Sequence, residues 1–395
     1  MYKRKEYQII KKRIEKESRK LIQVLIGPRQ VGKTTLIKQY LENTTLPWHY
    51  VSADGISGQD TIWLQQQWET ARVMMHQKKA REFLLVIDEI QKIPNWSEFV
   101  KAEWDKDSFD GTSIKVILLG SSSLLIQKGL SESLAGRFES IYLTHWSLEE
   151  MRAAFGYSAE QFAWFGGYPG ASEYAGNEDR WRDYVINSLI EPSILKDVLM
   201  LSRIDKPVLL RRIFELACNY SGQILSYNKM LGQLQDAGNS TTLAHYLNLL
   251  DHAGLVKGLN KFYFEKVRQR GSSPKLQVYN TALHSVQTGL SLSEIKLHPD
   301  KWGRIVESAI GAHLINHAKI SRVKIYYWRH IHDEMDFVIE KGDKIIGVEV
   351  KSGHSHKVSG LSSFQKQFKP LKILLVGKSG IPWEEFLQIS PGELF

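Results

Sequence analysis

The sequence predicts an α/β protein whose N-terminal part is built around a parallel β-sheet. Three apolar runs, at residues 21–26, 83–87 and 114–119, have the length and composition of buried strands. Each run ends in glycine or in acidic residues, and segments with helical spacing lie between the runs. This alternation is typical of an open sheet that binds its ligands at the carboxyl ends of its strands.

The composition limits the classes of protein to consider. A chain of 395 residues exceeds what one hydrophobic core usually organises, so we expect roughly two to four domains. The net charge of +9 is compatible with double-stranded DNA as a partner but does not require it. The lone cysteine, Cys218, excludes an intramolecular disulfide and is typical of a reducing compartment. No stretch approaches the ~20 apolar residues of a membrane-spanning helix, so we expect a soluble, cytoplasmic protein without a membrane partner.

The segment GPRQVGKTT follows the first apolar run and opens a predicted helix, which is the context that a phosphate-binding loop requires. Its glycines let consecutive N–H groups face inward, and the helix directs its positive N-terminus at the same point. Lys33 is predicted to neutralise the β- and γ-phosphates, and the Thr34 hydroxyl to coordinate Mg²⁺. The pattern therefore predicts binding of ATP with Mg²⁺. The predicted nucleotide-binding residues are Gly27, Pro28, Arg29, Gln30, Val31, Gly32, Lys33, Thr34 and Thr35.

The second apolar run ends in two acidic residues, Asp88 and Glu89. In a parallel sheet these carboxylates lie at the same edge as the phosphate-binding loop. We predict that Asp88 holds the shell of the Mg²⁺ ion and that Glu89 polarises the water that attacks the γ-phosphate.

Two further positions are candidates for the catalytic site. Ser121, or its neighbour Ser122, is predicted to contact the attacking water or the γ-phosphate, unless GSSS is an ordinary turn. Arg137 is predicted to act as an arginine finger, in its own subunit or in a neighbouring subunit of a homo-oligomer. A structural salt bridge is an equally good interpretation of this arginine.

These motifs resemble those of the bacterial and archaeal AAA-type ATPases that carry a C-terminal domain of unknown function. The resemblance rests on GPRQVGKTT, LLVIDEIQ, LLGSSS, SLAGRF, FGGYP and EMDFVIEKGDKIIGVEVKSG, and it covers nearly the whole chain. It implies a P-loop NTPase core that binds ATP, and a C-terminal module similar to restriction endonucleases. One position departs from the family pattern, because Asn280 stands where the resemblance implies an acidic residue.

The middle of the chain predicts a helical lid followed by a winged-helix-like domain. Ser147 is expected to cap the first helix of the lid. Further on, three predicted helices precede two strands that are joined by the basic sequence KVRQRGSSPK. That order resembles a winged helix–turn–helix, in which Arg268 and Arg270 would contact DNA phosphates. The third helix carries few positive charges, so packing against protein is an equally good role for it.

The last part of the chain carries a second group of charged residues. Alternate residues of a strand share one face, so Glu349 and Lys351 lie together and Asp336 can meet them from the partner strand. With Glu307 from a preceding helix, these residues resemble the catalytic group of PD-(D/E)xK nucleases, in which carboxylates hold Mg²⁺ and the lysine activates water. A structural Glu–Lys pair, or a nuclease fold that no longer cuts, is the competing interpretation.

These predictions lead to three hypotheses. The first is an ATPase that hydrolyses MgATP and couples the cycle to its C-terminal modules. The second is an ATP-gated binding switch with negligible turnover, and the third is a metal-dependent nuclease regulated by ATP. The predicted domains are a P-loop ATPase domain at 1–145, a helical lid at 146–205, a winged-helix-like domain at 206–280 and a restriction-endonuclease-like domain at 281–395.

Overall fold

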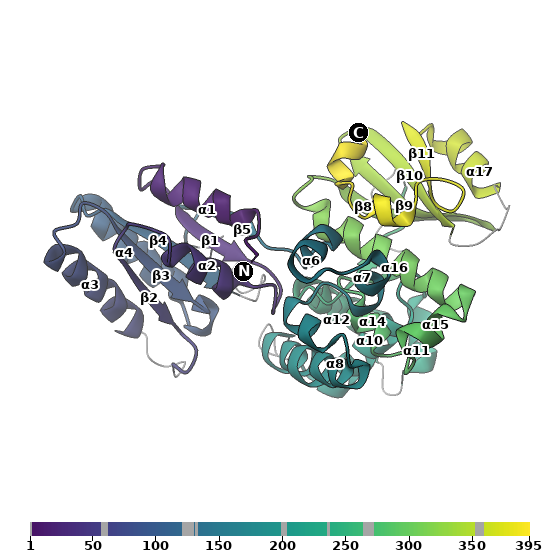
Figure 1. Cartoon of the computed structure of the whole chain (residues 1–395), viewed down its shortest axis with the longest axis horizontal. Helices are drawn as coiled ribbons and strands as arrows, with labels where there is room; N and C mark the ends of the chain where they lie inside the picture. The colour runs from purple at the N-terminus through teal and green to yellow at the C-terminus, as the bar shows by residue number, and fades with distance from the viewer. Residues whose placement is uncertain are drawn as a thin grey trace. The chain divides into compact units, whose positions relative to one another are not determined.

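A computed structural model of the chain describes residues 2–56, 62–120, 130, 133–198, 204–234, 238–263, 272–351 and 359–395. The chain forms two compact units, Met1–Leu143 and Thr144–Phe395 (Figure 1). The predicted division of the second unit into lid, winged-helix-like and nuclease-like domains stays a prediction. Among the helices of the described ranges, none combines the length and the apolar character that crossing a bilayer demands.

The N-terminal unit is built on a five-stranded parallel sheet in the order β2-β3-β4-β1-β5. The three central strands, β3, β4 and β1, are buried along their whole length, which is why the sequence shows them as continuous apolar runs. The strands are β1 Ile22–Ile26, β2 Trp48–Ser52, β3 Phe83–Asp88, β4 Ile114–Gly120 and β5 Phe138–Tyr142.

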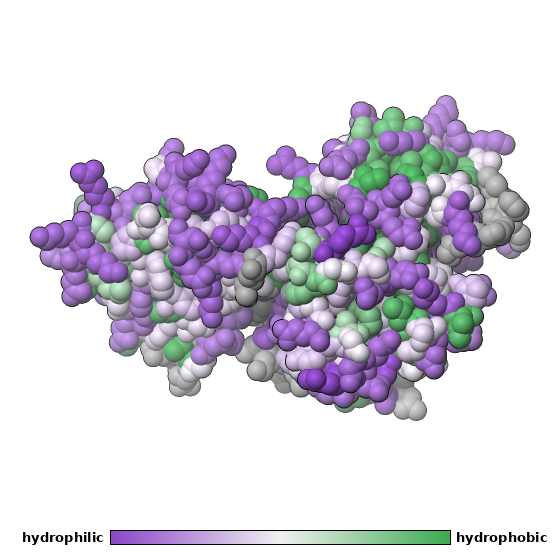
Figure 2. Space-filling model, in the orientation of Figure 1, coloured by the Kyte–Doolittle hydropathy of each residue, from purple (hydrophilic) through white to green (hydrophobic). Residues whose placement is uncertain are grey.

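Helices cover both faces of this sheet (Figure 1). Successive residues of a strand point to opposite faces, so Leu84 packs with one core and Leu85 with the other. The first core includes Ile10 and Ile37, and the second includes Trp68. The helices of the first face are α1 Glu6–Glu15 and α2 Lys33–Leu41, and those of the second are α3 Ile62–Gln77 and α4 Trp96–Phe109. In the view of Figure 2, hydrophilic side chains dominate the outer surface of this unit.

The second unit begins with helices. Ser147 caps α6 as predicted, and it forms a capping box with Glu150. Three helices and a two-stranded antiparallel ribbon, β6 and β7, follow one another in the order that the sequence predicts. Arg268 and Arg270 lie outside the described residues, and the winged-helix assignment stays a prediction. The elements are α6 Leu148–Phe155, α7 Ala159–Phe165, α8 Glu178–Tyr184, α10 Pro207–Asn219, α11 Tyr227–Gln233, α12 Ser240–His252, β6 Val256–Leu259, β7 Lys275–Val278, α14 Ala282–Ser285 and α15 Leu292–Lys296.

The chain ends in a four-stranded mixed sheet in the order β11-β10-β9-β8. The long helix α16 packs on one face through Val306 and Ile310, and α17 packs on the other through Phe364 and Phe368. The elements are α16 Pro299–Ala318, β8 Lys324–His330, β9 Asp333–Lys341, β10 Lys344–Lys351, α17 Ser359–Phe368, β11 Lys372–Gly377 and α18 Trp383–Phe386.

Candidate functional site

The predicted phosphate-binding loop connects the carboxyl end of β1 to the first turn of α2. Gly32, immediately before α2, has a φ of 88°, a left-handed conformation that other residues rarely adopt. A Cβ atom on Gly27 would lie 2.2 Å from the carbonyl oxygen of Leu143, so a larger residue would displace the loop. Backbone geometry therefore requires both glycines.

Lys33 is the first residue of α2, and only 7% of it is exposed to solvent. Its Nζ donates hydrogen bonds to the carbonyl oxygens of Gly27, at 2.8 Å, and of Pro28, at 2.7 Å. The ammonium is thus held against the loop by neutral acceptors. A phosphate bound in the loop would offer it charged acceptors, which form stronger hydrogen bonds.

Thr34 and Asp88 meet at the carboxyl edge of the sheet. The Thr34 hydroxyl donates a hydrogen bond of 2.7 Å to Oδ2 of Asp88, and the backbone N–H of Glu89 donates one of 2.8 Å to Oδ1. A hydroxyl beside a carboxylate supplies the hard oxygen ligands that Mg²⁺ takes next to a nucleotide phosphate. The residues present therefore fit a magnesium ion.

Tyr50 is a third member of this group, and the sequence analysis missed it. Its hydroxyl donates a hydrogen bond of 2.9 Å to the Asp88 oxygen that also accepts from Thr34. Burial, together with the neighbouring Asp88 carboxylate, raises the pKa of Tyr50, so the hydroxyl stays a donor. Tyr50 pairs with Val86 across β2 and β3, and its side chain reaches the residue two positions further along β3. The register of these two strands was the signal that could have identified it.

Glu89 follows β3 in a strained conformation. Its φ of 53° is left-handed, a conformation that costs about 1–3 kcal/mol for a residue other than glycine and that occurs at active sites as well as at turns. Oε2 of its carboxylate accepts a hydrogen bond of 2.5 Å from Nε2 of Gln91. The backbone strain agrees with a functional constraint at this position, and the catalytic role stays a prediction.

The structure does not bring the other catalytic candidates to this group. Ser121 and Ser122 fall outside the described residues, although β4, which precedes them, does lie between β1 and β3. The backbone carbonyl of Arg137 accepts a hydrogen bond from Ile22 at the amino end of β1, the edge opposite the phosphate-binding loop. The Arg137 guanidinium forms two hydrogen bonds, of 2.8 and 3.0 Å, with the Asp105 carboxylate. This placement favours the salt-bridge interpretation within one chain, and action on a neighbouring subunit stays a prediction.

The structure brings the four charged residues of the predicted C-terminal site together. Lys351 forms an ion pair with Glu349 on β10, and Oδ2 of Asp336 accepts a hydrogen bond of 2.8 Å from the backbone N–H of the residue between them. Glu307, on α16, joins the group through Lys275, which the sequence analysis missed. The only signal for Lys275 was that this charged residue opens a strand, all of which is buried in the structure.

Burial and mutual repulsion dominate the electrostatics of this group. Burial, together with the neighbouring Asp336 carboxylate, raises the pKa of Glu307 and that of Glu349 to about 7, although the nearby lysine ammonium groups oppose the shift. Burial disfavours the charge of Lys275, but the Glu307 and Asp336 carboxylates hold its pKa above the ordinary value. The Lys275 ammonium therefore stays charged.

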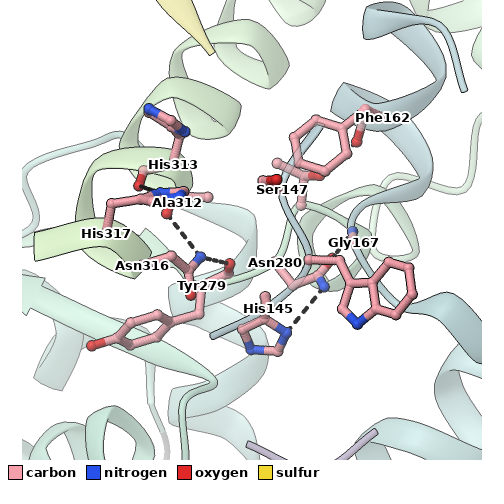
Figure 3. A pocket seen from close by; sticks show the side chains of 12 residues that line it. His145, Ser147, Phe162, Gly167, Tyr279, Asn280, Ala312, His313, Asn316 and His317 are labelled. Carbon is pink, nitrogen blue, oxygen red and sulfur yellow. Dashed lines mark hydrogen bonds between the residues drawn. The ribbon is translucent and has the colours of Figure 1, made fainter. Parts of the chain in front are cut away.

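Asn280, at the position where the resemblance implies an acidic residue, lines a small pocket in the second unit (Figure 3). Oδ1 of Asn280 accepts hydrogen bonds of 3.2 Å from the backbone N–H groups of Gly167 and Ala282. Its Nδ2 donates to Nδ1 of His145 at 3.2 Å, and Nε2 of His145 donates to the Gly254 carbonyl. The amide thus ties the FGGYP segment to the start of the second unit. An acid would lack the donor toward His145.

Comparisons with known proteins agree with the geometry of the first unit. The model of an AAA domain matches residues 19–152, and models of two domains of unknown function, DUF8612 and DUF4143, match residues 157–294 and 302–388. An uncharacterised protein of Mycobacterium tuberculosis is 27% identical over 340 residues, which are 85% of this chain and 71% of the relative. An uncharacterised protein of Methanocaldococcus jannaschii is 21% identical over 376 residues, which are 89% of this chain and 80% of the relative.

Among solved structures, a Walker-type ATPase of Pyrococcus abyssi is similar, with a TM-score of 0.48 and 13% identity, over 73% of this chain and 96% of that one. A similarity at that level says nothing about function. The AAA domain match and the parallel sheet define the N-terminal unit as an AAA-type P-loop domain, as predicted. Domains of this class bind a nucleotide, typically with Mg²⁺.

Proposed function

We propose that this protein binds ATP with Mg²⁺ in the loop between β1 and α2 and hydrolyses it to ADP and phosphate. The observation that supports this best is the 2.7 Å contact between Thr34 and Asp88. It joins the phosphate-binding loop to the acidic end of β3, so one divalent ion can be held by both. A loop that merely linked a strand to a helix would not require this pairing.

The residues of the loop bind and orient the triphosphate. The N–H groups at the start of α2 hold the phosphates, and Lys33 exchanges its loop carbonyls for phosphate oxygens. When bound, Mg²⁺ would stabilise charge on those oxygens as a Lewis acid, with Thr34 and Asp88 as its protein ligands. Tyr50 fixes the orientation of the Asp88 carboxylate.

Glu89 is the residue that we propose to act on water. Its carboxylate is half-buried at the same edge of the sheet as Asp88, where it can orient a water molecule and accept its proton. Ser121, the residue that follows β4 in the sequence, is proposed to donate a hydrogen bond to the γ-phosphate.

Phosphate release from ATP and Mg²⁺ tests this proposal. Wild-type protein is expected to release phosphate, Lys33→Ala to lose both ATP affinity and release, and Glu89→Gln to bind ATP while turnover falls about 100-fold or more. Glu98→Gln, an exposed glutamate on α4, is the matched control and is expected to behave as wild type. Release from the wild type at the level of Lys33→Ala would contradict hydrolysis, and if ATP still bound, it would favour the ATP-gated switch.

The nucleotide state is further proposed to reach the second unit, and through it a partner such as double-stranded DNA. Leu143, the last residue of the first unit, donates its N–H to the carbonyl of Ile26 and packs directly against Gly27. Two residues later, His145 is fixed by Asn280. We propose that a displacement of the loop is passed along the chain through this short segment. Phosphate release that rises severalfold with double-stranded DNA would support this coupling, and release that DNA leaves unchanged would exclude DNA as the partner.

A further inference from the structure

The charged group in the second unit, which consists of Glu307, Asp336, Glu349 and Lys351, already encloses a cation, the ammonium of Lys275. Lys275 has no exposure to solvent, and its Nζ lies 2.7 Å from Oε1 of Glu307, 3.1 Å from the carbonyl oxygen of Asp336 and 3.4 Å from Oδ1 of Asp336. The Phe337 ring covers another side of the ammonium, with its centroid 4.7 Å from Nζ. Oxygen atoms and an aromatic face thus surround the charge, as they surround a cation that a protein binds.

One oxygen of the group is left without a partner. Asp336 uses both carboxylate oxygens, one toward Lys275 and one toward the Val350 N–H, and Oε1 of Glu349 pairs with Lys351. Among the described residues, Oε2 of Glu349 is buried and has no hydrogen-bond partner of ordinary geometry, in a residue that is 7% exposed. An unsatisfied buried oxygen is costly, and this oxygen would be available to a metal ion once the Lys275 ammonium is removed.

The resemblance to nucleases implies a divalent metal ion, but the side chains present do not fit one. Mg²⁺ takes about six oxygen ligands at roughly 2.0–2.1 Å. Glu307 and Asp336, which would supply such ligands, are both engaged by the Lys275 ammonium. A divalent ion in that space would lie next to a fixed positive charge in a medium of low dielectric, where repulsion is strong. Within the described ranges, His, Cys, Asp and Glu side chains form no group of three or more that could hold a metal ion.

We propose that the Lys275 ammonium occupies the place of the divalent cation in this nuclease-like group, so that the second unit holds a built-in cation and does not cleave nucleic acid. Lys275 opens β7, Glu307 lies on α16 and Asp336 lies on β9. The lysine therefore joins the ribbon, the long helix and the C-terminal sheet at one point. A structural role of this kind explains why a charged residue occupies a place that no solvent reaches.

Binding of Mn²⁺ to the full-length chain, measured from the electron paramagnetic resonance of the free ion, tests this proposal. All variants carry Asp88→Asn and are studied without nucleotide, so that the phosphate-binding loop does not contribute. The parent protein is expected to bind no Mn²⁺ in the second unit. Lys275→Ala is expected to gain one site, at least tenfold tighter than any residual binding of the parent. Adding Glu349→Gln is expected to remove the new site.

Lys351→Ala is the matched control, because it removes a lysine of the same group but leaves Lys275 on Glu307 and Asp336. It is expected to bind no more Mn²⁺ than the parent. A folded Lys275→Ala protein that gains no site would overturn the proposal.

If Lys275→Ala does not fold, Mn²⁺ binding and plasmid nicking by the parent protein test the proposal instead. Mn²⁺ binding that Glu307→Gln or Asp336→Asn removes, or plasmid nicking that Asp336→Asn abolishes, would also overturn the proposal. An intact plasmid with Mg²⁺ and with Mn²⁺, together with no Mn²⁺ binding, would support it. Failure here leaves the ATPase proposal untouched, because that proposal depends on residues of the other unit.

Discussion

The Thr34 hydroxyl lies 2.7 Å from Oδ2 of Asp88, although the two residues are 54 positions apart in the sequence. Thr34 stands in the first turn of α2, which follows β1, and Asp88 ends β3, and β4 lies between β1 and β3 in the sheet. The parallel sheet makes this possible, because it brings all carboxyl ends of its strands to one edge. The predictions for the first unit depend on this edge.

Replacing Tyr50 by phenylalanine removes the hydrogen bond that orients Asp88. Partners of a metal-binding carboxylate typically contribute about 10–100-fold to metal affinity. We therefore expect the Mg²⁺ concentration that gives half-maximal phosphate release to rise roughly tenfold in Tyr50→Phe. Tyr40→Phe also loses one hydroxyl contact, which is made to Thr44 and not to Asp88, and it is expected to leave the Mg²⁺ requirement unchanged. Equal Mg²⁺ requirements in wild type and Tyr50→Phe would show that Tyr50 does not position Asp88.

Replacing Gly27 by alanine places a Cβ atom 2.2 Å from the carbonyl oxygen of Leu143. Both groups belong to the backbone or are fixed to it, so the loop must shift, at a cost of about 1–3 kcal/mol in the free energy of unfolding. We expect Gly27→Ala to lose ATP affinity at least tenfold as well as stability. Gly176→Ala is the control, since a Cβ atom there would meet nothing within 4 Å. Wild-type ATP affinity in Gly27→Ala would mean that the loop is not held in the geometry described.

Removing the Asn280 side chain leaves the N–H groups of Gly167 and Ala282 buried without acceptors. Each such loss costs about 1–3 kcal/mol, so Asn280→Ala is expected to destabilise the second unit by about 2–4 kcal/mol in urea denaturation. Asn280→Asp keeps the acceptor oxygen and is expected to lose less. Asn219→Ala, at the exposed end of α10, serves as the control and is expected to change stability by less than about 0.5 kcal/mol.

His313, on α16, gives the second unit a dependence on pH. Burial and the neighbouring His317 lower the pKa of His313 to about 3, and its Nε2 donates a hydrogen bond of 2.8 Å to the Ile389 carbonyl. In the unfolded chain the pKa is about 6.5, so below that value the unfolded state takes up a proton that the folded state does not. The stabilising contribution of neutral His313 is therefore present above pH 6.5 and is lost as the pH falls.

We expect the wild type to lose about 2 kcal/mol of unfolding free energy between pH 7 and pH 5 relative to His313→Gln, which keeps a donor for Ile389. Glu307 and Glu349 act in the opposite direction, since their raised pKa values favour the folded state at low pH and this contribution is lost as the pH rises through about 7. Both proteins contain them, so the difference between the two proteins isolates His313. Parallel stability curves would contradict the assignment.

The sequence predicted the elements of the first unit well, for a physical reason. β1, β3 and β4 are buried on both faces, and only continuous apolar runs satisfy that environment. The phosphate-binding loop was predictable because its function imposes glycines, a lysine and a hydroxyl at fixed spacing. The residues of that loop and the acidic pair therefore needed no knowledge of tertiary structure.

What escaped prediction depends on contacts between distant segments. Arg137 lies at the amino edge of the sheet because its backbone carbonyl accepts a hydrogen bond from Ile22. No local sequence pattern predicts this contact. β6, the first strand of the ribbon, ends at Leu259, because beyond Asn260 the chain leaves the ribbon and pairs with Tyr327 of β8. Lys275 could not be assigned to the acidic group until the ribbon was placed beside α16 and β9.

The most direct test is a titration of ATP, in the presence of Mg²⁺, onto the purified wild-type chain and onto Lys33→Ala. Saturable binding is expected for the wild type, with an affinity at least about tenfold weaker in Lys33→Ala, because that variant lacks the ammonium that faces the phosphates. If the wild type shows no saturable affinity, or if both proteins bind ATP equally, the loop between β1 and α2 is not a nucleotide site and the proposed ATPase activity is wrong.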